Sequence, residues 1–171
     1  MNKCFSDCYK GVSDMIKTNA MRLLTQAKIL FSTIEYEVDE HNLAGEHVAE
    51  QIGLPLEQVF KTLVAKGEKK GILVFCIPVN HEVDLKKAAK VVGDKKVEML
   101  PMKDLLKNTG YIRGGCSPVG MKKKYPTYID ETAVLYDKIS VSAGVRGCQM
   151  VLNPNDLIGY VSATTASLTV E

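Results

Sequence analysis

The stretch VFKTLVAKGEKKGILVFCIPV, residues 59–79, decides the fold of this chain. Its first part, residues 59–67, alternates in the manner of a half-buried β-strand. Residues 72–79 form a second, continuously apolar strand, and the turn at residues 67–71 between them predicts an antiparallel hairpin. The alternation sets Lys61 on the same face as Val59 and Leu63.

An ammonium group on an apolar strand face must find a partner, reach water or lose its proton, because burying an isolated charge is costly. Two interpretations of Lys61 remain open at this point. It either extends to water from the end of a strand, or it lines a cavity in which it binds a phosphate or carbonyl oxygen.

The rest of the chain alternates between helical and extended patterns. Helices are expected at residues 18–30, 44–52, 84–92, 101–108 and 154–160, and further strands at 31–38, 97–100, 127–130, 133–136, 139–143 and 149–152. Strands joined by both turns and helices predict an α+β fold with a mixed, largely antiparallel, barrel-like sheet flanked by helices. A doubly wound parallel fold is the alternative.

Composition and length indicate one ordinary globular domain. The chain has 171 residues, of which 46% are hydrophobic and 25% charged. Its longest apolar run, residues 71–79, is far shorter than the roughly 20 residues of a membrane-spanning helix. The N-terminus lacks the apolar segment of a secretory signal, so we expect a cytoplasmic protein that does not contact the membrane. The five cysteines form no C-x-x-C pair, which favours reduced thiols.

Several chemical classes lack their motifs. The chain contains no G-x-G spacing of a Rossmann fold, no G-x-S-x-G elbow and no H-E-x-x-H pattern, so we expect no cofactor and no metal. Residues 115–122 approach a P-loop, but the lysine is one residue late and Pro118 removes an amide donor. A thiol mechanism at Cys116 stays open, although a cysteine that merely packs is the commoner case.

Basic residues gather in one part of the chain. Residues 81–124 hold eleven Lys and Arg against five Asp and Glu, a local excess of six. This stretch predicts either a phosphate-facing surface or a set of solvated helix faces.

Two turns stand out beside this basic stretch. The loop from Gly114 to Pro118 leaves backbone amides free for close approach by a ligand. The segment SAGVRG, residues 142–147, would present a hydroxyl and a guanidinium together. Arg146 could instead pair with Asp156 or Asp130 and be structural.

Six separated motifs then resemble one family. They are KTNAMRLL at 17–24, FKTLV at 60–64, LKKAAK at 85–90, TGYIRGGCSPVGMKKK at 109–124, ISVSAGVRG at 139–147 and NPNDL at 153–157. In this order they resemble the YbaK family of stand-alone Cys-tRNA(Pro) deacylases, relatives of the editing domain inserted in bacterial prolyl-tRNA synthetases. The resemblance runs from about residue 17 to the C-terminus.

The resemblance implies a set of site residues. Lys61 matches the essential lysine of the family's F-K-T-L motif, and Gly114 and Pro118 match its G-x-x-x-P motif. The substrate-binding residues it implies are Tyr36, Gly114, Gly115, Ser117, Pro118, Ser142 and Asp156, with Lys122, Lys123 and Lys124 as contacts to tRNA phosphates.

The resemblance also implies a reaction and partners. In this family the substrate's own cysteine thiol attacks its ester carbonyl, so the protein supplies positioning and charge. The expected substrate is the acceptor end of Cys-tRNA(Pro), with Cys-tRNA(Cys) as a further one, and prolyl-tRNA synthetase is the expected transient partner. An Ala-tRNA(Pro) deacylase and a non-catalytic aminoacyl-tRNA binding module are the alternatives.

Two features depart from the family pattern. Residues 1–16 are expected to be a flexible N-terminal extension before a domain at residues 17–171, and Met15 could be the true initiator. We therefore assign no role to Cys4 and Cys8. Cys116 stands where an apolar residue is usual, which favours packing.

Overall fold

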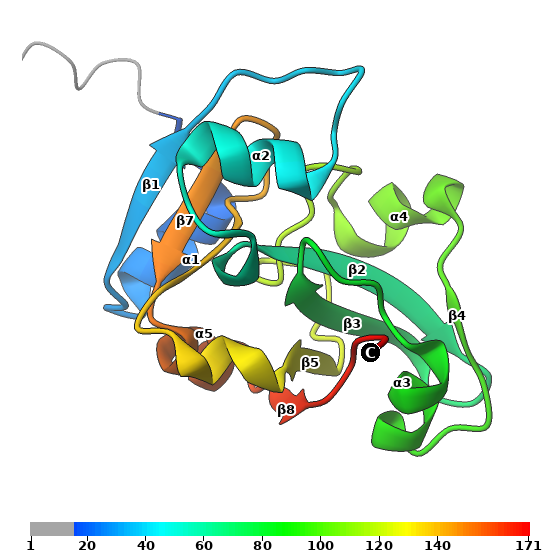
Figure 1. Cartoon of the computed structure of the whole chain (residues 1–171). Helices are drawn as coiled ribbons and strands as arrows, with labels where there is room; N and C mark the ends of the chain where they lie inside the picture. The colour runs from blue at the N-terminus through cyan, green and yellow to red at the C-terminus, as the bar shows by residue number, and fades with distance from the viewer. Residues whose placement is uncertain (1–15) are drawn as a thin grey trace, which may run out of the picture.

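The computed structural model describes residues 16–171, which form two β-sheets with helices packed around them (Figure 1). Cys4, Cys8 and nearly all of the expected N-terminal extension lie outside the described residues. The mixed α+β architecture confirms the predicted fold class, although the strands form two sheets rather than one and neither sheet closes into a barrel.

The larger sheet is built on the predicted hairpin. Strands β2 (Phe60–Gly67) and β3 (Gly71–Pro78) pair antiparallel, with Lys61 opposite Ile77. The sheet order is β4-β2-β3-β5-β8. Strand β4 (Val97–Met99) is antiparallel to β2, whereas β5 (Thr127–Asp130) and β8 (Thr164–Ala166) add parallel strands beyond β3.

The smaller sheet is antiparallel, in the order β1-β7-β6. Its strands are β1 (Phe31–Glu35), β6 (Ile139–Ser142) and β7 (Cys148–Leu152). A single parallel bridge between Val59 and Ser140 joins it to the start of β2. The two sheets therefore meet where the hairpin begins.

Two local predictions differ from the structure. Residues 133–136 were expected to form a strand, but residues 133–135 belong to the 3-10 helix η2 (Glu131–Leu135) and Tyr136 follows its end. The helix starts where Asp130 Oδ1 accepts a hydrogen bond from the Thr132 amide at 3.1 Å. This local cap competes with extension into a sheet. Strand β8, in contrast, was not predicted, because its sequence has no strong apolar alternation. It forms where the chain returns alongside β5 and pairs with it in parallel.

The five α-helices within residues 16–171 agree with the predicted positions to within a few residues. They are α1 (Asn19–Gln26), α2 (Gly45–Ile52), α3 (Leu85–Val92), α4 (Met102–Thr109) and α5 (Pro154–Val161), and the 3-10 helix η1 (Leu56–Gln58) precedes β2. Helix α3 shows why its ends could be predicted. Asp84 Oδ1 accepts hydrogen bonds from the Lys86 and Lys87 amides at its start, and Gly93 ends the helix in a left-handed conformation.

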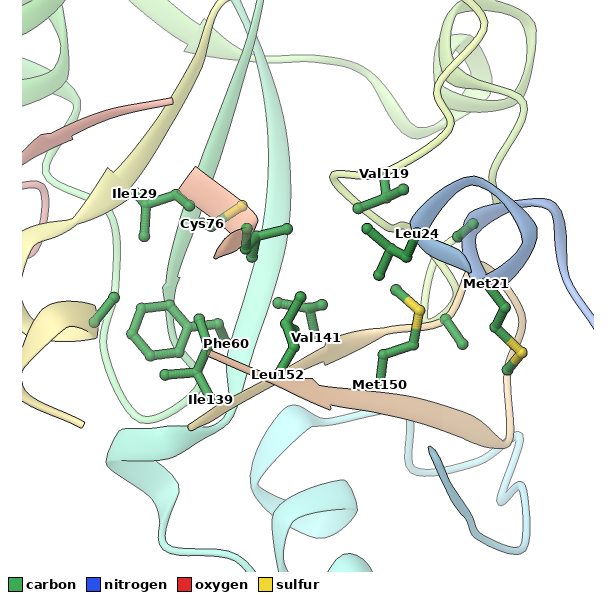
Figure 2. Packing of buried hydrophobic residues seen from close by; sticks show 14 of the residues in the cluster. Met21, Leu24, Phe60, Cys76, Val119, Ile129, Ile139, Val141, Met150 and Leu152 are labelled. Carbon is green, nitrogen blue, oxygen red and sulfur yellow. The ribbon is translucent and has the colours of Figure 1, made fainter. Parts of the chain in front are cut away.

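The largest core cluster lies between the two sheets (Figure 2). Phe60, Cys76 and Ile129 reach it from the larger sheet, and Ile139 and Met150 reach it from the smaller one. A second cluster packs α3 against the opposite face of β2 and β3. Within residues 16–171, no helix has the length and apolarity that crossing a membrane requires.

Candidate functional site

Lys61 lies on a face of β2 that two helices cover only in part. Val59, two residues earlier on this face, packs with Ala49 and Ile52 of α2. Leu63, two residues later, packs on the cluster that contains α3. Lys61 therefore falls between the two covered regions, and its side chain is 26% exposed.

The Lys61 ammonium has two partners beyond the end of β3. Its Nζ donates to the Val79 carbonyl oxygen at 3.4 Å and lies 3.6 Å from Glu82 Oε1. The charge thus stays at the rim of the molecule, while the stem of the side chain is partly covered. Both partners leave the ammonium open to a ligand from solvent.

The glycine loop at residues 114–118 packs directly on the 142–147 turn. Arg146 Nε donates to the Arg113 carbonyl at 2.9 Å, and a Cβ at Gly115 would stand 3.1 Å from the Arg146 amide nitrogen. Gly114 has φ +83, a conformation that side chains rarely adopt. Arg146 holds the two turns together in this way, rather than pairing with Asp130 or Asp156.

A small pocket, with room for about one water molecule, forms where these turns meet α2. It is lined by Tyr36, Leu43, His47, Gln51, Gly114 and Arg146, among others. The Tyr36 amide donates to the Gly147 carbonyl at 2.9 Å, which ties the end of β1 to the second turn. The structure therefore brings Tyr36 and Gly114 together in one pocket, and their expected contacts with the substrate stay predictions. His47 and Gln51 were not predicted, although their spacing of four residues places both on one side of a helix.

Ser142 lies at the end of β6, in the smaller sheet. A single parallel bridge between Val59 and Ser140 joins this strand to the start of β2, and β2 and β6 pack against each other. Ser142 is buried, and its Oγ accepts a hydrogen bond from the Gly144 amide at 3.1 Å. Lys61 itself does not line the pocket under α2.

The other expected site residues have different surroundings. Gly115, Ser117 and Pro118 are buried, and Ser117 Oγ accepts a hydrogen bond from the Val119 amide at 3.2 Å. Their expected contacts with the substrate stay predictions. Asp156 is exposed in the first turn of α5, which lies far from α2 in Figure 1. Its expected contact with the substrate stays a prediction.

The three consecutive lysines after the glycine loop are exposed. Lys122 crosses back over the end of α4, where its Nζ donates to the Lys107 carbonyl at 3.4 Å. Their exposure is compatible with the phosphate contacts predicted for Lys122, Lys123 and Lys124. These contacts stay predictions.

The cysteine thiols near the site are protonated at neutral pH. Burial raises the pKa of Cys116 to about 12, and it does the same for Cys76. A thiol with such a pKa is a poor nucleophile. Among residues 16–171, no group of three or more His, Cys, Asp or Glu side chains gathers in a way that could hold a metal ion.

Comparison with known proteins identifies the class. The model of the aminoacyl-tRNA editing domain family matches residues 40–160. The chain belongs to this family, as the sequence motifs predicted, and its class of activity is that of an aminoacyl-tRNA deacylase.

Individual relatives agree with this assignment. The chain is 50% identical to the Enterococcus faecalis protein named "Putative Cys-tRNA(Pro)/Cys-tRNA(Cys) deacylase EbsC", over 91% of this chain and 94% of that one. It is also 28% identical to a proline–tRNA ligase of Thermosipho africanus, where 64% of this chain matches 19% of the ligase.

Solved structures share the fold. One, described as "a putative trans-editing enzyme for prolyl tRNA synthetase", superposes with a TM-score of 0.76 at 23% identity and covers 91% of this chain and all of its own. The hypothetical protein APE2540 superposes with a TM-score of 0.79 at 16% identity, over 87% of this chain and 97% of its own.

Proposed function

We propose that this protein removes cysteine from mischarged Cys-tRNA(Pro), and also from Cys-tRNA(Cys), by a reaction in which the substrate supplies the nucleophile. The observation that carries the proposal is the position of Lys61. Its ammonium stands between the regions covered by α2 and α3, where the side chain is 26% exposed, while the Cys76 and Cys116 thiols are buried and protonated. The relative of 50% identity, whose name specifies these two substrates, supports the same choice.

The reaction proceeds in two steps. The cysteine thiol of the substrate attacks its own ester carbonyl, a carbon–sulfur bond forms, and the bond to the ribose oxygen breaks. The thiol proton passes to the ribose hydroxyl, which leaves with the tRNA, and water then opens the cyclic thiolactone to give cysteine. Lys61 binds the terminal phosphate or the ester end, and amides near Gly114 stabilise negative charge on the carbonyl oxygen.

The relatives support a choice of partner. Proline–tRNA ligases contain a segment similar to this chain, so in those enzymes the domain is attached to the protein that charges the tRNA. The relative of 50% identity is matched over 94% of its own length, so most of that protein is this domain and it needs another way to reach a tRNA. We propose a transient complex with prolyl-tRNA synthetase in the cytoplasm, where the exposed lysines 122–124 contact tRNA phosphates.

The test compares three esters on one tRNA. Cys-tRNA(Pro), Ala-tRNA(Pro) and Ser-tRNA(Pro) are incubated with the wild type and with Lys61→Ala. We expect rapid loss of cysteine alone and a fall of about 100-fold or more with Lys61→Ala, the usual range for a group that stabilises developing charge. Lys66→Ala, on the same strand but exposed on the other face, is the matched control and should change the rate little.

Other outcomes point elsewhere. Preferential loss of alanine would indicate an Ala-tRNA(Pro) deacylase with a size-selective pocket. Binding of all three esters without hydrolysis would indicate a binding module. An unchanged rate with Lys61→Ala would show that Lys61 is structural.

A further inference from the structure

Glu82 is the acidic neighbour of the site lysine. Its Oε1 lies 3.6 Å from Lys61 Nζ, and its side chain is 84% exposed. Among the described residues, its carboxylate makes no other hydrogen bond or ion pair. The pair therefore presents a positive and a negative charge side by side to solvent.

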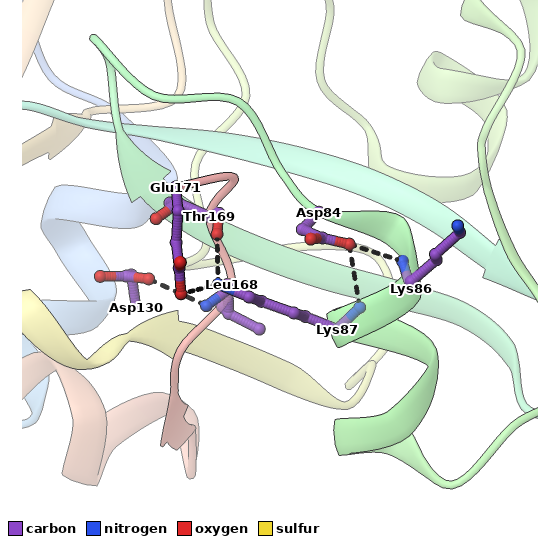
Figure 3. A network of polar contacts seen from close by, with 7 residues as sticks. All are labelled: Asp84, Lys86, Lys87, Asp130, Leu168, Thr169 and Glu171. Atoms are coloured by element: carbon purple, nitrogen blue, oxygen red, sulfur yellow. Dashed lines mark hydrogen bonds and ion pairs between the residues drawn. The ribbon is translucent and has the colours of Figure 1, made fainter.

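The backbone that carries Glu82 is held firmly by the C-terminal segment. The Val170 amide donates to the Glu82 carbonyl at 2.9 Å, and the Asp84 amide donates to the Leu168 carbonyl at 2.7 Å. Leu168 is itself fixed, because its amide donates to the buried Asp130 at 3.0 Å (Figure 3). The Glu82 carboxylate thus projects from a fixed position rather than from a mobile loop.

The stability of the fold does not explain why a carboxylate stands beside Lys61. An exposed ion pair between flexible side chains contributes little to folding. Lys61 already has the Val79 carbonyl as a hydrogen-bond acceptor, so it does not need Glu82 to stay satisfied. A carboxylate that extends from a firmly held backbone beside the site lysine, and that contributes little to folding, is suited to recognising a ligand.

The two charges match the end of an aminoacyl ester. The ester carbonyl oxygen and the α-amino group are attached to adjacent carbon atoms, so they are only a few ångström apart. An α-amino group titrates near neutral pH, with a pKa of about 8 in a peptide, so it is partly cationic under working conditions. A carboxylate beside an ammonium can bind both groups at once.

We propose that Glu82 binds the α-ammonium group of the aminoacyl ester while Lys61 binds its oxygen end. This inference rests on the proposed function and deepens it. It makes Glu82 a specificity-determining residue that favours esters with a free amino group and disfavours N-acylated ones. No cysteine thiol or tRNA contact takes part in this choice.

The experiment compares Cys-tRNA(Pro) with N-acetyl-Cys-tRNA(Pro), each rate being divided by the spontaneous rate for the same ester. The wild type should prefer the free amine by about tenfold or more, the worth of one charge-assisted hydrogen bond. Glu82→Gln should reduce that preference to about twofold, mainly by slowing the free-amine substrate. Glu98→Gln is the matched control, because it removes a comparable exposed Lys–Glu pair on β4.

Each result decides between roles. If Glu82→Gln slows the deacylation of both esters equally, Glu82 only positions Lys61. If the variant keeps the wild-type preference for the free amine, Glu82 does not contact the amine. Either result overturns the inference while the proposed function stands. A wild type that hydrolyses neither ester would overturn the proposed function and this inference with it. Thermal unfolding of both variants verifies that they are folded.

Discussion

At the scale of single residues, the buried thiols are the groups whose chemistry the fold changes most. Cys76 is completely buried between β2 and the core, and burial raises its pKa from 9.0 to about 12, although the Thr62 hydroxyl lowers it in part. The folded chain therefore holds this proton over a pH range in which the unfolded chain releases it. The stability that results is fully present below pH 9.0 and is lost as the pH rises through about 12.

We expect Cys76→Ala to flatten the alkaline loss of stability. Between pH 9 and 11 the free energy of unfolding of the wild type should fall more steeply than that of the variant, by up to about 1.4 kcal/mol per pH unit. Urea denaturation at a series of pH values measures both slopes. Equal slopes for the wild type and the variant would contradict this expectation.

Cys116→Ala should keep the deacylation rate near that of the wild type, because the proposed reaction uses the thiol of the substrate. An inactive Cys116→Ala variant that is still folded would contradict this second expectation.

At the scale of elements, the site depends on the close packing of two turns. A Cβ at Gly115 would stand 3.1 Å from the Arg146 amide nitrogen and from the Val145 carbonyl carbon, and both are backbone atoms that cannot move aside alone. A substitution there separates the glycine loop from the 142–147 turn, which carries Ser142. Stability and geometry should therefore change together.

We predict that Gly115→Ala lowers the stability by about 1–3 kcal/mol, the usual cost of overpacking, and slows deacylation. Gly159→Ala is the control: Gly159 lies within α5 with nothing near its would-be Cβ, so alanine should stabilise the helix by about 0.5–1 kcal/mol and leave the rate unchanged. Thermal unfolding and single-turnover rates test both variants. A Gly115→Ala protein as stable and active as the wild type would show that the two turns are not packed this closely.

At the scale of the whole molecule, the two sheets share one core. Phe60 begins β2 beside the Val59–Ser140 bridge and is buried against residues of the smaller sheet (Figure 2). Lys61 comes from one sheet and Ser142 from the other, so these two expected site residues keep their relative position only when both sheets are packed.

Phe60→Ala should lower the free energy of unfolding by about 3–5 kcal/mol, because the cavity it leaves opens between the sheets. Unfolding should remain a single transition, with far-ultraviolet circular dichroism and tyrosine fluorescence changing together. Leu135→Ala, at a side chain that is 73% exposed, should change stability by less than about 0.5 kcal/mol. Two separate transitions in the wild type would mean that the sheets fold independently.

The local elements were largely predictable from the sequence. The β2–β3 hairpin, the Asp84 cap and the glycine stop of α3 depend on residues close together in the chain, and the structure confirms them. The face on which Lys61 lies follows from strand alternation alone. The wrong strand at residues 133–136 arose because a local cap at Asp130 outweighs the apolar pattern.

By itself, the sequence determined most of the strands and helices, the face of Lys61 and the motifs of an aminoacyl-tRNA editing domain. Only the tertiary structure decided that the strands divide into two sheets, that α2 lines a pocket with Gly114 and that Glu82 stands beside Lys61. The reason is physical: alternation and capping act between neighbours along the chain. Contacts such as Val59 with Ser140, or Glu82 with Val170, join distant residues and form only when both sheets and the C-terminal segment pack together.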